Sequence, residues 1–420
     1  MKKLLSLMLV FCLLVGCVCV FASCDDNEGY GDQVNALDQV SIGSFPIPDD
    51  FKIGFIFLHD ENSTYDLNFI NAAKKIKTYF NLSDDQVVME INVPEEGTDC
   101  FDAAERLVAK GCKIIFADSF GHEDNMIKAA EKYPNVQFCH ATGTKALVKE
   151  LDNYHNAFAS IFEGRYLAGI AAGLKLNEMI EDGKITAEEA VIGYVGAFPY
   201  AEVVSGYTSF YLGARSVCPT ATMKVRYTDS WYDYDKEKAA AKSLIEIDNC
   251  VLISQHADSW GAPSLCEEKG VPNVSYNGST VEAGPNTFII SSAIDWSHYF
   301  YYIIDCAVNG EDIAPNWCGN LSTGSVILSA INADVAAEGT VEAIKNAAKA
   351  LKAGTLKVFD TSKFTVNGET LDSYLADVID NGDYVGETEV IVNGYFAESE
   401  FRSAPYFDLR IDGITEINNA

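Results

Sequence analysis

The chain has 420 residues, of which 48% are hydrophobic and 11% aromatic, a composition typical of globular proteins with large cores and not of disordered ones. Its 61 acidic residues outnumber 30 basic ones, and the formal net charge of -31 argues against a nucleic-acid partner, because phosphates bind Lys and Arg. At about 150 residues for each domain, the chain has room for two domains behind a short leader.

The first 24 residues are typical of a secretory leader. Lys2 and Lys3 precede an apolar run that begins at Leu4, and the chain becomes polar at residue 25. Two boxes of small residues end in Cys17 and Cys24, and both resemble a bacterial lipobox, in which the cysteine is lipidated. We expect Cys24, or else Cys17, to anchor the protein to the outer face of the cell membrane. The alternative is an uncleaved transmembrane anchor, which fits the small residues and the cysteine less well.

From residue 51 onward, short apolar runs alternate with amphipathic stretches. The apolar runs predict strands over 51–58, 87–91, 113–117 and 136–140, and the helical spacing predicts helices over 66–80, 99–110 and 124–133. After a long helix predicted over 163–179, the pattern predicts strands over 191–195, 222–227, 251–254 and 274–276, and helices over 203–216, 235–246 and 262–269. Such alternation indicates an α/β fold with doubly wound parallel sheets. Two series of this kind predict two lobes.

The predicted domains follow from this pattern. A signal peptide over 1–24 and a flexible acidic tether over 25–49 precede the globular body. We assign residues 50–162 with 286–322 to one lobe, and 163–285 with 323–363 to the other. The strand- and turn-rich segment 364–420 is expected to be a C-terminal elaboration packed on the lobes. No apolar segment of about 20 residues follows the leader, so we expect no further membrane span.

Neither the cysteines nor the histidines have the spacing of a metal site. Eight of the twelve cysteines lie after the leader and form no CxxC pair, so we expect no zinc site. An exported chain could form disulfides, but Cys112, Cys139 and Cys250 lie in or beside apolar runs, so we expect most of the eight to be unpaired core residues.

The sequence contains no GxSxG, P-loop or HExxH motif, and no GxGxxG after a strand. We therefore expect a protein that is not an enzyme and needs no cofactor or metal.

Aromatic and polar residues gather directly after the predicted strands, where open α/β sheets bind their ligands. Aromatic faces with a few polar groups suit a flat, uncharged heterocycle. Some of the aromatic side chains are equally well explained as core, and the histidines as solvated loop residues. The candidates are Tyr65, Phe120, Phe198, Trp231, Asp258 and Asn277, and after them Asp60, Asn62, His122, His256 and Trp260.

The segment from Phe158 to Gly169 (FASIFEGRYLAG) resembles the conserved crossover of the basic membrane protein family, the substrate-binding lipoproteins of ABC importers. Further matches follow in chain order, and together they cover about residues 52–328. They are DSFG at 118–121, YPNVQF at 133–138, HATG at 140–143, FP at 198–199, EVV at 202–204, LGARSV at 212–217, DSWYD at 229–233 and QH at 255–256. The chain is most similar to the branch associated with purine bases and nucleosides.

The resemblance implies two Rossmann-like lobes of the type I periplasmic-binding-protein fold, joined by three crossovers, with a ligand clamped between them. It also implies roles for particular residues. Phe120, Phe198 and Trp231 would line or stack on the base, and Asp258 and Asn277 would form hydrogen bonds with it.

The chain departs from the pattern of the family it resembles at Thr64 and at Asn277. Purine-binding relatives often have an aromatic residue where this chain has Thr64, and we expect Tyr65 to substitute for it. They also tend to have Asp where this chain has Asn277. An amide donates as well as accepts hydrogen bonds, so the preferred edge of the ligand is expected to differ.

The sequence thus predicts a lipid-anchored, monomeric solute-binding protein that captures a purine base or nucleoside and delivers it to an ABC permease. Ligand contact with both lobes would stabilise a closed state by hinge motion. Two alternatives come from other classes. One is a receptor domain that reports its ligand to a membrane signalling protein, and the other, less favoured, is a secreted nucleoside hydrolase.

Overall fold

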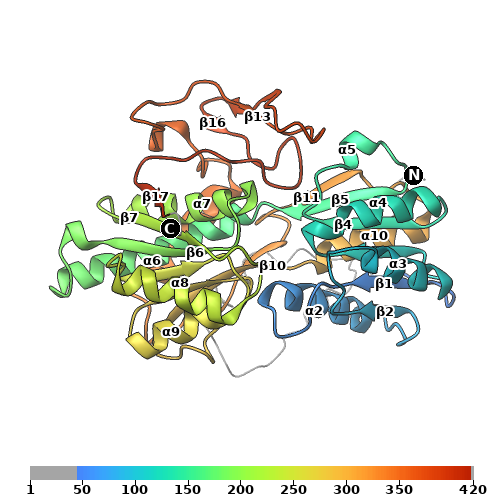
Figure 1. Cartoon of the computed structure of the whole chain (residues 1–420), viewed down its shortest axis with the longest axis horizontal. Coiled ribbons are helices and arrows are strands. Elements are labelled where there is room, and N and C mark those ends of the chain that lie inside the picture. The colour runs from blue at the N-terminus through green and yellow to red at the C-terminus, as the bar shows by residue number, and fades with distance from the viewer. Residues whose placement is uncertain (1–44, 418–420) are drawn as a thin grey trace, which may run out of the picture.

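The computed structural model describes residues 45–417 and shows two lobes side by side with a further segment above them (Figure 1). The leader, the candidate lipid anchors Cys17 and Cys24, and all but the last five residues of the expected tether lie outside the described residues.

Six strands form the sheet of the first lobe, in the order β11-β5-β4-β3-β1-β2, and every neighbouring pair is parallel. The strands are β1 (Ile53–Ile56), β2 (Val87–Glu90), β3 (Ile114–Ala117), β4 (Gln137–Ala141), β5 (Tyr154–Ala159) and β11 (Asn316–Gly319). The helices of this lobe are α2 (Thr64–Tyr79), α3 (Asp99–Ala109), α4 (Glu123–Lys132), α5 (Ala146–Lys149) and α10 (Ser297–Asn309).

Both faces of this sheet are buried, as a parallel sheet requires. Successive residues of a strand point to opposite faces, and Ile114 and Phe116 accordingly pack in one core with Phe69 of α2, whereas Ile115 and Ala117 pack in another core with α3 and α4. The continuous apolar runs of the sequence arise from this two-sided burial.

Seven strands form the sheet of the second lobe, in the order β12-β10-β9-β8-β6-β7-β17. All neighbours are parallel except β10 and β12, which are antiparallel. The strands are β6 (Val191–Gly196), β7 (Thr222–Tyr227), β8 (Leu252–Gln255), β9 (Asn273–Tyr276), β10 (Phe288–Ile294), β12 (Val326–Leu328) and β17 (Ile414–Glu416). The helices are α6 (Ile161–Glu181), α7 (Ala201–Val217), α8 (Tyr234–Glu246), α9 (Gly261–Lys269) and α11 (Thr340–Lys352).

Helices α6 and α7 approach each other so closely that glycine is needed at their contact. A Cβ atom on Gly169 would lie 2.0 Å from the carbonyl oxygen of Phe210, and one on Gly213 would lie 2.0 Å from that of Tyr166. The small residues of α6 therefore allow it to pack backbone to backbone against α7.

The chain passes between the lobes at three places: from β5 to α6, from β10 to α10, and from β11 to β12. The sequence predicts lobe boundaries after residues 162, 285 and 322, and the first and third crossings run between Ala159 and Ile161 and between Gly319 and Val326. The second differs, because β10 pairs with β9 and β12 in the second sheet, and the chain returns to the first lobe only after Ile294 and not at residue 286.

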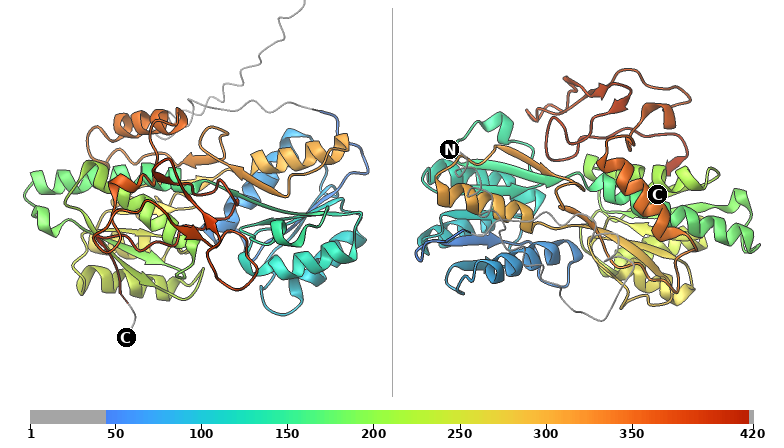
Figure 2. Two further views of the ribbon diagram at one scale, coloured as in Figure 1. Left: turned by 90° about the horizontal axis from the view of Figure 1, so that it is seen from above. Right: turned by 180° about the vertical axis from the view of Figure 1, so that it is seen from behind.

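Residues 364–417, which we call the extension, lie over both lobes (Figures 1 and 2). Two short antiparallel ladders form within it, β13 (Leu375–Ala376) with β14 (Thr388–Glu389) and β15 (Ile391–Val392) with β16 (Tyr395–Phe396). Its last strand, β17, joins the second sheet beside β7. It also contacts the first lobe: Thr144 Oγ1 donates to Asp380 Oδ2 at 2.6 Å, and the Ser403 amide donates to Asn316 Oδ1 at 2.9 Å.

Three further properties concern residues 45–417. The eight cysteines in this range are all free. No three His, Cys, Asp or Glu side chains in the range are grouped as a metal site would need. None of the described helices combines the length and the apolar character of a membrane span.

Candidate functional site: a pocket between the lobes

A pocket lies where the carboxyl ends of the two parallel sheets meet, and its empty volume of about 390 Å³ includes space open to solvent. The first lobe contributes Leu58, His59, Tyr65, Asp66, Ser119, Phe120 and Thr142, and the second contributes Glu202, Trp231, His256, Asp258, Tyr276 and Asn277. Both lobes would therefore contact a ligand held here.

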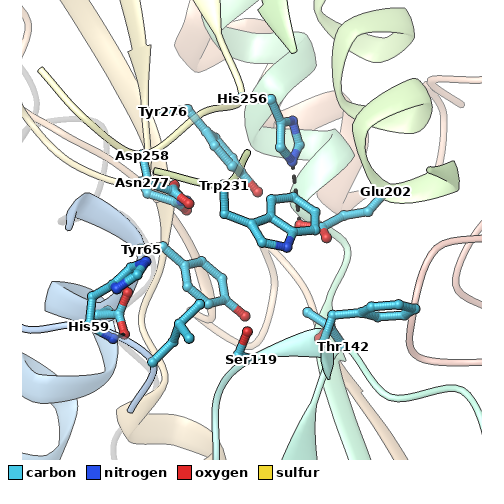
Figure 3. Close-up of a pocket in the computed structure, with 13 residues that line it drawn as sticks. His59, Tyr65, Ser119, Thr142, Glu202, Trp231, His256, Asp258, Tyr276 and Asn277 are labelled. Carbon is cyan, nitrogen blue, oxygen red and sulfur yellow. Dashed lines mark hydrogen bonds and ion pairs between the residues drawn. The ribbon is translucent and has the colours of Figure 1, made fainter. Parts of the chain in front are cut away.

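Aromatic rings from both lobes surround the pocket. Figure 3 shows the indole of Trp231 and the phenol rings of Tyr65 and Tyr276 around the same space. Trp231 is supported from behind by Phe198, whose ring meets the indole edge-on at a centroid distance of 5.1 Å. Tyr200 in turn stacks on Phe198 at 5.1 Å. The indole is thus held in one orientation by other rings.

A buried carboxyl group, Asp258, stands beside these rings. Its Oδ1 accepts a hydrogen bond from Asn277 Nδ2 at 3.0 Å, and its amide donates to the carbonyl of Trp231 at 3.0 Å. Burial raises the pKa of Asp258 well above its usual range, although the bond from Asn277 acts in the opposite direction. The two side chains together can therefore offer both a donor and an acceptor to a ligand.

In the first lobe, two further carboxyl groups hold the loop that follows β1. Asp66 accepts hydrogen bonds from the amide of His59 at 2.7 Å and from Ser63 Oγ at 2.6 Å. Asp118 accepts from the Leu58 amide at 3.1 Å, and its carbonyl accepts from the Tyr65 hydroxyl at 2.8 Å. Burial, with Asp66 nearby, raises the pKa of Asp118 well above its usual range. This network fixes the Tyr65 ring at the edge of the pocket.

The lobes are in direct contact at the start of α2. The amide and the hydroxyl of Thr64 both donate to the carbonyl oxygen of Asp258, at 3.1 Å and 3.0 Å. Nearby, the rings of His59 and Tyr232 lie 5.4 Å apart, again one from each lobe. The pocket is therefore closed on this side by the first turn of α2.

A family model described as "ABC transporter substrate-binding protein PnrA-like" matches residues 60–360. The chain belongs to this family. Its architecture is the type I periplasmic-binding-protein fold, with two α/β lobes each built on a parallel sheet. As an ABC transporter substrate-binding protein, it takes a small-molecule ligand and works with an ABC permease outside the cytoplasm.

Individual relatives of this PnrA-like protein differ in what their names say they bind. Over 348 residues it is 29% identical to a purine-binding protein of Brucella abortus, a match that covers 81% of the chain and 91% of the relative. Over 225 residues it is 34% identical to a putative ABC transporter glucose-binding protein of Haloferax volcanii, which covers 54% of each chain. A solved solute-binding protein of an ABC transporter from Conexibacter woesei has a similar fold, with a TM-score of 0.58 at 18% identity over 73% of this chain and 98% of that one.

Six candidates from the sequence of this PnrA-like protein line the pocket, namely Tyr65, Phe120, Trp231, His256, Asp258 and Asn277. The structure places the other five elsewhere. Phe198 lies behind Trp231. His122 is buried beneath the first lobe's loops, where its Nε2 contacts the carbonyl of Val93 and burial lowers its pKa to about 4.

The remaining three are on the surface. Asp60 accepts hydrogen bonds from the amide and the side chain of Asn62, at 3.0 Å and 2.7 Å, and the pair forms an exposed turn. Trp260 precedes α9 and is 37% exposed outside the pocket.

The pocket also contains residues outside the candidate set: Leu58, His59, Asp66, Ser119, Thr142, Glu202 and Tyr276. Glu202 had a usable signal, since it lies in the first turn of the helix that follows β6, and helix N-termini face the ligand side of an α/β sheet. Tyr276 had no such signal in the sequence. It is the last residue of β9, and the direction of its side chain depends on the register of that strand.

Proposed function

We propose that this PnrA-like protein binds a purine base or nucleoside in the pocket between its lobes, and that the lobes close on the ligand by a hinge motion. A lipid anchor at Cys24, or at Cys17, would hold the monomeric protein beside the ABC permease that receives the ligand. The observation that carries the proposal is the pair of aromatic walls, Trp231 from the second lobe and Tyr65 from the first, on one pocket.

Aromatic side chains bind flat rings through their faces, and stacking on a base contributes about 1–3 kcal/mol. A ring held between Trp231 and the first lobe would contact both lobes at once. Such a ligand binds the closed form better than the open form, so it shifts the population toward closure. Phe120, at the rim of the pocket and 42% exposed, is placed to cover the ligand.

The polar groups suit the edge of a purine. Asp258 and Asn277 lie side by side, and together they present carboxyl and amide groups to a ring that carries nitrogen donors and acceptors. Because burial raises the pKa of Asp258, this carboxyl can keep its proton and donate a hydrogen bond to a ring nitrogen. When it releases the proton to solvent, it can instead accept a hydrogen bond from a ligand N–H.

Glucose is the second candidate, because the Haloferax volcanii relative is named as a glucose-binding protein. Sugars also pack on tryptophan, so the rings alone do not separate the two ligands. The purine is favoured because the purine-binding relative matches over 91% of its own length, whereas the glucose-binding relative matches over 54%.

A calorimetric and thermal-shift screen tests the proposal. The protein is titrated with adenine, guanine, hypoxanthine, adenosine, inosine and guanosine, and in parallel with D-glucose. A ligand at one hundred times its Kd stabilises the fold by about 2.7 kcal/mol, which a thermal shift detects. Binding of at least one purine is expected. Binding of D-glucose with no response to any purine would refute the purine assignment.

The same samples test the enzymatic alternative. After incubation with inosine or adenosine, chromatography should recover the nucleoside intact. Release of free base in proportion to the protein added would show a nucleoside hydrolase.

A further inference from the structure

We propose that Glu202 determines which edge of the ligand faces it, because its carboxylate accepts a hydrogen bond from an N–H or O–H group, and that a relay of buried hydrogen bonds holds it in that role. The relay runs from Arg165 through Tyr194 to His256. The inference rests on the proposed function, because it names what the same pocket requires of its ligand.

The relay begins at Arg165, which α6 places in the interior of the second lobe with no exposed surface. One guanidinium nitrogen, Nη1, donates to the carbonyl of Ser275 at 3.1 Å. The other, Nη2, donates to the hydroxyl oxygens of Ser254 at 2.8 Å and Tyr194 at 3.1 Å. A guanidinium has only donors, so the Tyr194 oxygen must act as acceptor in this bond.

The direction of each later bond follows from that first one. Since the Tyr194 oxygen accepts from Arg165, its own hydrogen is free to point at His256 Nδ1, 3.2 Å away. Burial lowers the pKa of His256, although Glu202 acts in the opposite direction, so the imidazole is neutral and carries one hydrogen. With Nδ1 accepting, that hydrogen sits on Nε2 and points at Glu202 Oε1 at 3.4 Å.

Glu202 Oε1 therefore accepts a hydrogen bond from His256, and the remaining lone pairs of the carboxylate are available to a ligand in the pocket. It lies in the first turn of α7, at the positive end of the helix dipole. Its side chain is 15% exposed and lines the pocket, as Figure 3 shows together with the contact to His256. An ionised carboxylate has no donor, so it accepts a ring N–H, an exocyclic amine or a sugar hydroxyl and rejects a ligand edge that has only lone pairs.

Packing fixes the imidazole where the relay needs it. The ring of Tyr276 lies 4.3 Å from that of His256. On the side of α7, a Cβ atom on Gly206 would lie 2.6 Å from His256 Cε1 and Nδ1, so only glycine leaves room for the ring. Gly206 follows Glu202 by four residues and lies on the same face of the helix. Gly206 and His256 are accordingly positioning residues for Glu202.

Two substitutions and their combination test the inference. In Glu202→Gln, the amide oxygen accepts from His256, so the NH₂ group faces the pocket and opposes the ligand's donor. Its affinity for the purine that binds the wild type most tightly, measured by calorimetry, should fall at least about tenfold. Gly206→Ala should also weaken binding by displacing the imidazole. In the double variant, Gly206→Ala should add nothing further, because it acts through Glu202.

The controls separate this inference from the function on which it rests. Glu188→Gln changes an exposed carboxylate outside the pocket and should bind like the wild type. The melting temperatures without ligand report whether each variant folds.

If no purine binds the wild type but D-glucose does, the purine proposal fails. Glu202→Gln is then titrated with D-glucose, whose hydroxyls also donate. Unchanged affinity of Glu202→Gln for the ligand that binds the wild type would overturn the inference, and equal losses from Gly206→Ala in both backgrounds would overturn the relay.

Discussion

Trp231 joins two loops of the second lobe at the pocket. Its carbonyl accepts a hydrogen bond from the amide of Asp258 at 3.0 Å, so the loop after β7 is tied to the loop after β8. Its indole is held between the pocket and the ring of Phe198. The backbone of Trp231 thus positions Asp258, while its side chain forms a wall, and the two roles can be separated by mutation.

Trp231→Ala should remove the wall and leave the backbone bond to Asp258 in place. With a loss of about 1–3 kcal/mol of stacking, the Kd for adenine or inosine should rise about tenfold or more in calorimetry. Tyr234→Ala is the matched control, because Tyr234 is a nearby aromatic that is 41% exposed and outside the pocket. An equal loss of affinity in both variants, or none in either, would contradict the stacking role.

At the scale of elements, β17 secures the end of the extension to the second sheet. It pairs in parallel with β7, and Glu416 Oε1 accepts hydrogen bonds from the hydroxyls of Tyr207 at 2.7 Å and Tyr227 at 2.6 Å. Arg410 lies 3.0 Å from the same carboxylate oxygen. One short strand therefore provides the partner for two tyrosines and covers the edge of β7.

A chain truncated after Asp412 should be less stable by about 2 kcal/mol or more, because Tyr207 loses the partner of its hydroxyl and β7 becomes an open edge. Urea unfolding gives the free energy of both forms. A second truncation, after Ile417, keeps β17 and should unfold like the full chain. Equal midpoints for all three proteins would show that β17 contributes nothing to stability.

The elements differ in how far the sequence predicts them. Strands such as β1 and β3 are buried on both faces, so their apolar runs are visible without any tertiary information. Strand β17 has only three residues, Ile-Thr-Glu, and forms because β7 offers an edge. The sequence pattern predicts residues 288–294 in the first lobe, whereas β10 pairs with β9 of the second sheet, because the composition of a strand does not say which sheet it joins.

The same distinction applies to the candidate site. The rule that ligands bind after the ends of parallel strands located six pocket residues, among them Trp231 and Asp258. It could not distinguish Trp231 from Phe198, because both follow strands and only packing decides which ring faces the pocket. The position of Glu202 at the start of a helix is visible in the sequence, but its contact with the buried His256, 54 residues away in the chain, is visible only in the structure.

At the scale of the whole molecule, the two lobes meet through Thr64, which donates twice to the carbonyl of Asp258. These bonds exist only while the lobes are in contact, so under the proposed hinge motion they would stabilise the closed form. A ligand that requires closure would then gain affinity from any contact that makes closure easier.

Thr64→Val should remove one of the two bonds without changing the shape of the side chain. A neutral hydrogen bond contributes about 1 kcal/mol, so the Kd for the best purine should rise about fivefold. Small-angle scattering should show the ligand-induced decrease in radius of gyration at a higher ligand concentration than in the wild type. Thr222→Val, on an exposed position of β7, serves as control. Wild-type affinity in Thr64→Val would mean that this contact does not contribute to closure.

The burial of the cysteines has a practical consequence for measuring that motion. Seven of the eight free cysteines in residues 45–417 are buried. The eighth, Cys318, is partly buried, and the loss of hydration raises the pKa of its thiol to about 12, so little reactive thiolate is present near neutral pH. A maleimide dye would therefore leave the native thiols of both lobes unlabelled. A single cysteine introduced in place of Tyr200, which is 45% exposed and faces Phe120 of the other lobe at 5.7 Å, would be the reactive thiol among residues 45–417, and a dye attached there would turn the protein into a fluorescent sensor of its own ligand.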